Sequence, residues 1–109
     1  MSEPIQVVTS VEALGRPIRA FKGLVVGHAI VEVDVFEGED VELPGGGKRV
    51  GAYERTFVAA RTAALADLLA DARRLGANAV VDVRLQFGEV DPSSEASVFA
   101  AFTGTAVVV

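Results

Sequence analysis

Hydrophobic and polar residues alternate along two segments of the chain, as they do in β-strands that bury one face. In the first segment, residues 17–36, three valines alternate with two acidic residues: Val31, Val33 and Val35 with Glu32 and Asp34. Successive side chains of a strand point to opposite faces, so the valines should be buried and the acidic residues wet. Gly23 and Gly27 interrupt the segment and indicate a bend or bulge.

The second alternating segment lies at residues 77–87, and an uncharged segment ends the chain. Four apolar residues alternate with polar ones in the second segment: Val81, Val83, Leu85 and Phe87 with Asp82, Arg84 and Gln86. Residues 97–109 are apolar on both faces of a predicted strand. Such a strand needs cover on both sides, and one helix covers only one of them, so a second subunit is expected over the other.

The segment Ala52–Leu75 has the periodicity of one long helix. Its apolar stripe, at three- and four-residue spacing, comprises Val58, Leu65, Leu68, Ala72 and Leu75. Basic residues in the last turn and Gly76 beyond them indicate the helix C-terminus. With a short strand at Ile5–Thr9, the order of elements predicts a single domain, residues 1–109, of class α+β. We expect a two-layer sandwich of an antiparallel sheet and one long helix.

Composition narrows the classes of function and partner. The formal charge is −5, half of the 109 residues are apolar, and there is no cysteine. An acidic chain lacks the basic face that nucleic acid or an anionic membrane requires, so neither is expected as a partner. The absence of cysteine excludes disulfides, thiolate metal sites and thiol catalysis. Neither a signal pattern nor an apolar run near the ~20 residues of a membrane helix is present, so we expect a cytoplasmic protein.

The segment Pro44–Arg55, PGGGKRVGAYER, brings three glycines and two basic residues to the start of the helix. A Walker phosphate loop would need Ser or Thr after Lys48, where Arg49 stands, and its first glycine is missing. A weaker hypothesis remains, in which helix amides near Gly51 hold an anion beside Lys48 and Arg49. The alternative, which we favour, is a flexible connector whose helix dipole is satisfied by Glu54.

His28 is the only histidine, and on a strand it shares a face with Glu32 and Asp34. One imidazole and two carboxylates could bind a divalent metal. The carboxylates lie roughly 13 and 20 Å from His28 along a regular strand, so ligands would have to converge at a bend or from other subunits. The alternative is a solvated strand face. No catalytic triad or carboxylate pair can be assembled, so no catalytic residue is expected, and Tyr53 is expected to pack with a wet hydroxyl.

Four segments, in order and together covering nearly the whole chain, resemble the YbjQ family of small bacterial and archaeal proteins. They are GLVVGHAI (Gly23–Ile30), GAYE (Gly51–Glu54), LADARRLGANAVVDVRL (Leu69–Leu85) and GTAV (Gly104–Val107). The resemblance implies a β-α-β-β subunit similar to the dodecin-like fold, assembled as a ring-shaped homopentamer. It also implies a heavy-metal-binding role, with a divalent metal as the ligand.

Two functions from different classes are therefore expected. The first is a non-enzymatic homo-oligomeric, pentameric binding or scaffold protein, whose partner is itself and which needs no cofactor. The second is a metal- or anion-dependent protein with its site at a subunit interface, drawn from His28, Glu32, Asp34, Lys48, Arg49 and Tyr53. Metal analysis of the purified protein, with His28→Ala as the control, separates the two.

Overall fold

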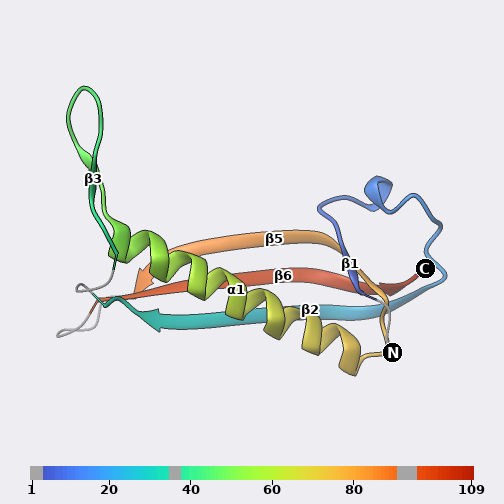
Figure 1. Ribbon diagram of the computed structural model, residues 1–109. Coiled ribbons are helices and arrows are strands. Elements are labelled where there is room, and N and C mark those ends of the chain that lie inside the picture. The colour runs from blue at the N-terminus through green and yellow to red at the C-terminus, as the bar shows by residue number, and fades with distance from the viewer. Residues whose placement is uncertain (1–3, 35–37, 91–95) are drawn as a thin grey trace.

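One long helix lies along one face of a four-stranded sheet, and a two-stranded hairpin stands off one end of the molecule (Figure 1). The computed structural model describes residues 4–34, 38–90 and 96–109. The elements are β1 (Gln6–Val7), the 3₁₀ helix η1 (Val11–Leu14), β2 (Ala20–Glu32), β3 (Val41–Glu42), β4 (Lys48–Arg49), α1 (Gly51–Arg74), β5 (Ala79–Val90) and β6 (Ser97–Val108). In the described part of the chain, no helix is long and apolar enough to cross a membrane.

The sheet has the strand order β1-β5-β6-β2. The three long strands pair antiparallel, with β6 in the middle, and the two-residue β1 pairs parallel to the start of β5. The predicted α+β class with two layers is confirmed. The short β1 makes the sheet mixed, which the alternation pattern of so short a segment could not indicate.

Helix α1 begins and ends within one residue of the predicted bounds. Val50 is its N-cap, and Gly76 has a φ of 80°, the left-handed conformation expected just past a helix C-terminus. The face that packs on the sheet, however, is a regular four-residue series of mostly small side chains: Ala52, Thr56, Ala60, Ala64, Leu68 and Ala72. The predicted stripe is wrong at Val58, which is half exposed, and right at Leu68 and Ala72.

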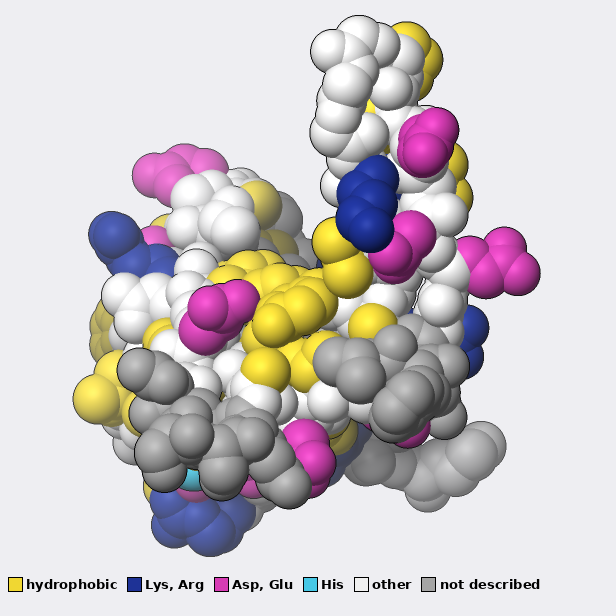
Figure 2. Space-filling view, turned by 90° about the vertical axis from the view of Figure 1, so that its left-hand side faces the viewer, with side chains coloured by type: hydrophobic (Ala, Val, Ile, Leu, Met, Phe, Trp, Pro, Cys, Tyr) yellow, Lys and Arg dark blue, Asp and Glu magenta, His cyan; other side chains and the backbone are white. Residues whose placement is uncertain are grey.

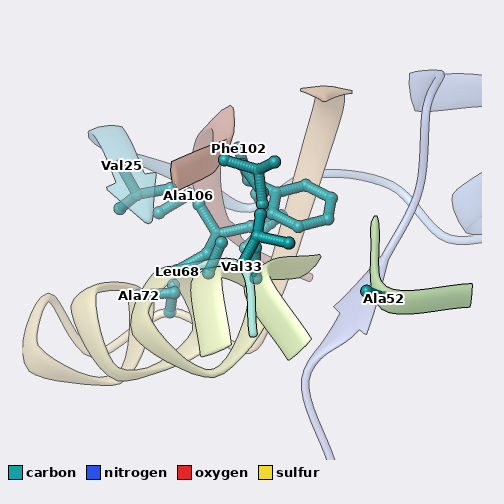
Figure 3. Packing of buried hydrophobic residues seen from close by; sticks show 13 residues of the cluster. Val25, Val33, Ala52, Leu68, Ala72, Phe102 and Ala106 are labelled. Atoms are coloured by element: carbon teal, nitrogen blue, oxygen red, sulfur yellow. The ribbon is translucent and has the colours of Figure 1, made fainter. Parts of the chain in front are cut away.

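Small side chains face the sheet because the helix approaches it very closely. A Cβ added to Gly27 of β2 would lie 2.2 Å from the carbonyl oxygen of Ala64 and 2.3 Å from the amide nitrogen of Leu68. Only a glycine beneath an alanine stripe permits that approach. Around this crossing, Leu68 and Ala72 face Val25 and Ala106 of the sheet in one continuous core (Figure 3).

Strand β5 changes face part-way along its length. Its register against β6 shifts between Val81 and Arg84, and Asp82 there has a φ of 54°. Val81 packs in a cluster on the helix-free face, whereas Val83 packs in the helix-side core. The prediction that Val81 and Val83 share one face is therefore wrong, because a bulge inserts one residue and inverts the alternation.

The N-terminal segment covers one end of the helix-free face. Leu14 of η1 and the partly buried Ile18 pack against Val81 and Val107 there, and Figure 1 shows this segment beside the C-terminus. The expectation that a second subunit covers the helix-free face of the terminal strand is thus corrected at Val107, which the chain itself buries.

Candidate functional site

The three predicted metal ligands lie on the exposed face and end of β2, an edge strand of the sheet. His28 and Glu32 are exposed in the strand, and Asp34 is exposed just after it. His28 Nδ1 lies 3.8 Å from Asp67 Oδ2 of α1. Among residues 4–34, 38–90 and 96–109, no three His, Cys, Asp or Glu side chains come together closely enough to hold a metal ion.

Two aspartates of α1 close part of the free edge of β2. The backbone N–H of Val26 donates to Asp71 Oδ2 at 3.2 Å, and that of His28 donates to Asp67 Oδ2 at 3.1 Å. Arg74 Nη2 donates to Asp71 Oδ1 at 2.8 Å. This guanidinium, followed by the Val26 amide, lowers the pKa of Asp71 below its ordinary value. Unpaired strand edges can pair with strands of other molecules. The two aspartates prevent this at Val26 and His28, because they accept hydrogen bonds from the edge N–H groups.

Two pockets flank α1 on this side, and they separate the predicted ligands. One, of about 360 Å³, is lined by Val26, Asp67, Ala70, Asp71 and Arg74, beside His28. The other, of about 120 Å³, is lined by Val31, Glu32, Asp34, Ala52, Arg55, Thr56 and Ala59. Glu32 and Asp34 thus share a pocket that His28 does not line. A metal site using all three would need a contribution from another copy.

The predicted glycine-rich connector is wrong in form, because residues 41–49 make a β-hairpin. The Leu43 N–H donates to the Gly47 carbonyl at 3.0 Å, and the Gly46 N–H donates to the Leu43 carbonyl at 3.2 Å. Gly45, Gly46 and Gly47 all have positive φ, which lets the chain reverse between two short strands. We name residues 40–50 the arm.

Carboxylates of the chain itself occupy the predicted anion-binding groups. Lys48 Nζ lies 3.1 Å from Asp40 Oδ2, and the Gly51 N–H donates to Asp40 Oδ1 at 3.2 Å. Arg49 donates through Nε to Glu54 Oε2 at 2.9 Å and makes a second bond through Nη2. An external anion would have to displace Asp40 or Glu54, so anion binding stays a prediction. The partner that sequence reasoning missed is Asp40, and the acidic run before the glycines was its only signal.

These contacts perturb the charged groups in the expected directions. Lys48, then the Gly51 amide, lowers the pKa of Asp40. The Arg49 guanidinium lowers the pKa of Glu54, and Glu54 raises the pKa of Arg49 in return. Together the two pairs fix the foot of the arm to the first turn of α1.

The sheet leaves apolar side chains exposed on both of its faces. The β2 strip lies on the helix-free face of β2 and comprises Phe21, Leu24, Val26 and Ile30. The β5 patch lies on the helix side of β5, which is exposed there because α1 packs chiefly over β2 and β6. It contains Leu85, Phe87 and Phe57, whose ring meets that of Phe87 edge-on at 5.2 Å.

The comparison with known proteins decides the family. The sequence model of the YbjQ family, described as "Putative heavy-metal-binding", matches residues 5–109. The chain belongs to the YbjQ family. A UPF0145 protein of Methanothermobacter thermautotrophicus is 35% identical to this YbjQ chain over 105 residues, 93% of each chain.

A solved structure supports the fold of the YbjQ chain independently. A DUF74-family protein from Pediococcus pentosaceus, titled as a protein with unknown function, matches with a TM-score of 0.67. The match covers 96% of this chain and 97% of that one at 12% identity. At that identity the likeness speaks for the fold alone.

Proposed function

We propose that this YbjQ protein is a non-enzymatic homo-oligomer, a closed ring of five copies, that acts as a binding or scaffold protein in the cytoplasm. The observation that carries the proposal is the β2 strip. Phe21, Leu24 and Ile30 are 71%, 72% and 63% exposed on one face of one strand. Large apolar side chains gathered on one face mark interaction surfaces, even though His28 lies between Val26 and Ile30 here, whereas scattered ones need no explanation.

The shape of the chain supports the same proposal. Its radius of gyration is 17.1 Å, whereas a compact domain of this length is expected near 13 Å. The arm projects from one end of the molecule instead of folding back on the core (Figure 1). A chain this extended gains compactness by packing against copies of itself.

The number five rests on the resemblance to the YbjQ family, and closure rests on physical grounds. A sheet whose two edges are only partly covered can pair with further copies without limit. A closed ring prevents this, because each edge is covered by a neighbour. An obligate interface of this kind resembles a domain core that is divided between two subunits.

Light scattering at micromolar concentration tests the proposal. We expect a mass of about five times the 11.4 kDa chain, and a fall in mass for Ile30→Asp, which would bury a carboxylate in the interface. Val11→Asp is the matched control, since Val11 is 40% exposed in η1 and is not a member of the β2 strip. A folded monomer of the unmodified chain at this concentration would overturn the proposal.

Metal binding at a subunit interface is the second candidate. The description of the YbjQ family favours it, as does the approach of His28 to Asp67. Elemental analysis after equilibration with zinc is expected to find metal bound in proportion to subunits, and His28→Ala is expected to lose it. Arg61→Ala is the control, because Arg61 is exposed on α1 and belongs to none of the candidate sites. Equal metal content in the protein and in His28→Ala would remove His28 as a ligand.

A further inference from the structure

The arm carries apolar side chains that its own copy leaves uncovered. Val41 is 52% exposed and Leu43 is 44% exposed, and both lie on one side of the hairpin because they are two residues apart. Within the part of the chain that the structure describes, β3 and β4 pack extensively only against each other. An isolated two-stranded hairpin is marginally stable in water, so a second surface is needed to hold it.

The foot of the arm fixes its direction. Asp40 binds both Lys48 and the first amide of α1, and Arg49 binds Glu54 one turn into the helix. A Cβ on Gly51 would lie 2.2 Å from the Glu39 carbonyl oxygen, so the chain is also tightly packed at this point. Figure 2 looks at this end of the molecule and shows the arm standing clear of the body, with hydrophobic side chains gathered at its foot. An arm held in this way points away from the body of its own copy (Figure 2).

The two edges of the sheet differ in how they are protected. The β2 edge is closed at Val26 and His28 by the aspartates of α1. The β5 edge is covered by the N-terminal strand only as far as Val83, whose N–H donates to the Val8 carbonyl. Beyond Val83, the described residues place no strand along the outer edge of β5. That edge can therefore pair with an incoming strand.

The β5 patch lies directly beside this open edge. Leu85 and Phe87 are on the helix side of β5, and both are exposed. A strand paired with the edge would lie about 4.8 Å from β5. Alternate side chains of that strand would then pack beside Leu85 and Phe87 on the same face of the sheet. Val41 and Leu43 have the two-residue spacing that such pairing requires.

We propose that the arm of one copy docks on the β5 edge of the next copy, adding its strands to that sheet and covering Leu85 and Phe87 with Val41 and Leu43. The inference rests on the homo-oligomer proposed above and names its contact. Donor and acceptor are different surfaces of the same chain, so the contact is head-to-tail and repeats around a ring. Both surfaces offer apolar side chains and strand backbone, and the two basic residues at the foot of the arm are paired, Lys48 with Asp40 and Arg49 with Glu54.

Disulfide trapping tests the contact directly, because the natural chain has no cysteine. Protein with Leu43→Cys is mixed with protein with Leu85→Cys, subunits are allowed to exchange, and the mixture is oxidised mildly. Paired strands bring Cα atoms within disulfide range. We expect the Leu43–Leu85 cross-link between copies to form on the order of tenfold faster than a collisional one, because docking raises the effective concentration.

Val11→Cys in η1 is the matched control partner for Leu43→Cys, because Val11 belongs to neither the β2 strip nor the arm. Val11 is 40% exposed and Leu85 37%, so random collision would favour neither position. Preferential cross-linking to Leu85→Cys supports docking. Equal or faster cross-linking to Val11→Cys overturns the arm contact.

A second pair of variants measures the contact without cysteine. The double variant Val41→Asp with Leu43→Asp should lower the mass of the assembly while leaving far-ultraviolet circular dichroism unchanged, because both residues are exposed in a single copy. Val11→Asp should change neither. A wild-type monomer would refute the proposed function itself, whereas an assembly unaffected by the arm variants would refute the arm contact alone.

Discussion

Asp82 shows how one backbone conformation reorganises a strand. It is the one non-glycine residue with positive φ in the described part of the chain, and it sits at the bulge where β5 changes face. Asp tolerates the left-handed region better than most residues, and β-branched residues tolerate it worst. Because of the bulge, Val81 packs in the cluster with Leu14 on the helix-free face, and Val83 packs in the helix-side core.

We therefore expect Asp82→Gly to leave the free energy of unfolding unchanged or slightly higher, and Asp82→Val to lower it by about 1–3 kcal/mol. Urea denaturation followed by circular dichroism measures both. Gln86→Val is the control, because Gln86 lies in the regular part of the same strand and is exposed. If Asp82→Val lowers the free energy of unfolding no more than Gln86→Val does, the positive φ at Asp82 does not restrict which residue the bulge accepts.

The helix is the element whose buried face differs most from its sequence pattern. Leu68 is fully buried in the core, whereas Val58 is half exposed. We expect Leu68→Ala to lower the free energy of unfolding by about 2–5 kcal/mol, and Val58→Ala to change it by less than about 0.5 kcal/mol. Chemical denaturation of the two variants decides the orientation of α1, and the reverse order of effects would contradict it.

The contact between α1 and the β2 edge depends on pH. The lowered pKa of Asp71 means that its contribution to stability is present above the ordinary value of 3.8 and is lost as pH falls through the lower, folded value. Asp71→Asn keeps an acceptor for the Val26 amide but loses the charge pair with Arg74. We expect the variant to be less stable at pH 7 and to lose less stability than the natural protein on acidification below about pH 4.

Denaturant midpoints measured across that pH range test the assignment. Arg74→Ala is the companion variant. It removes the guanidinium that does most to lower the pKa of Asp71, and it leaves the Asp71 carboxylate in place. Like Asp71→Asn, Arg74→Ala should lose less stability than the natural protein on acidification below about pH 4. Parallel pH profiles in all three proteins would show that this contact does not contribute to acid sensitivity.

At the scale of the whole molecule, the helix-free face of the sheet is buried at the Val107 end and exposed at Ile30 of β2. Val107 is fully buried against Leu14 and Ala79 within one copy. We expect Val107→Asp to unfold the chain, because it places an unpaired carboxylate in that copy's own interior. Ile30→Asp should instead release a folded subunit, because Ile30 is exposed in one copy. Circular dichroism combined with light scattering distinguishes the two, and folded monomers from Val107→Asp would contradict this division.

Local periodicity alone was enough to predict the class of the fold. The bounds of α1, the Gly76 cap and the wet face of β2 with His28 and Glu32 follow from it, since strand and helix periods depend only on backbone geometry. The family resemblance was likewise carried by the sequence. The absence of cysteine and the acidic charge bounded the chemistry in the same direct way.

Tertiary structure decided everything that depends on which surfaces meet. Helix α1 turns its alanines to the sheet because Gly27 admits a close approach, a fit of sizes that the periodicity of apolar residues cannot reveal. The bulge at Asp82 reverses a pattern that reads as continuous. Asp40 meets Lys48 only when the arm folds back on itself. Asp67 and Asp71 reach the β2 edge only when α1 crosses it, because these contacts join residues 39 and 45 positions apart in the chain.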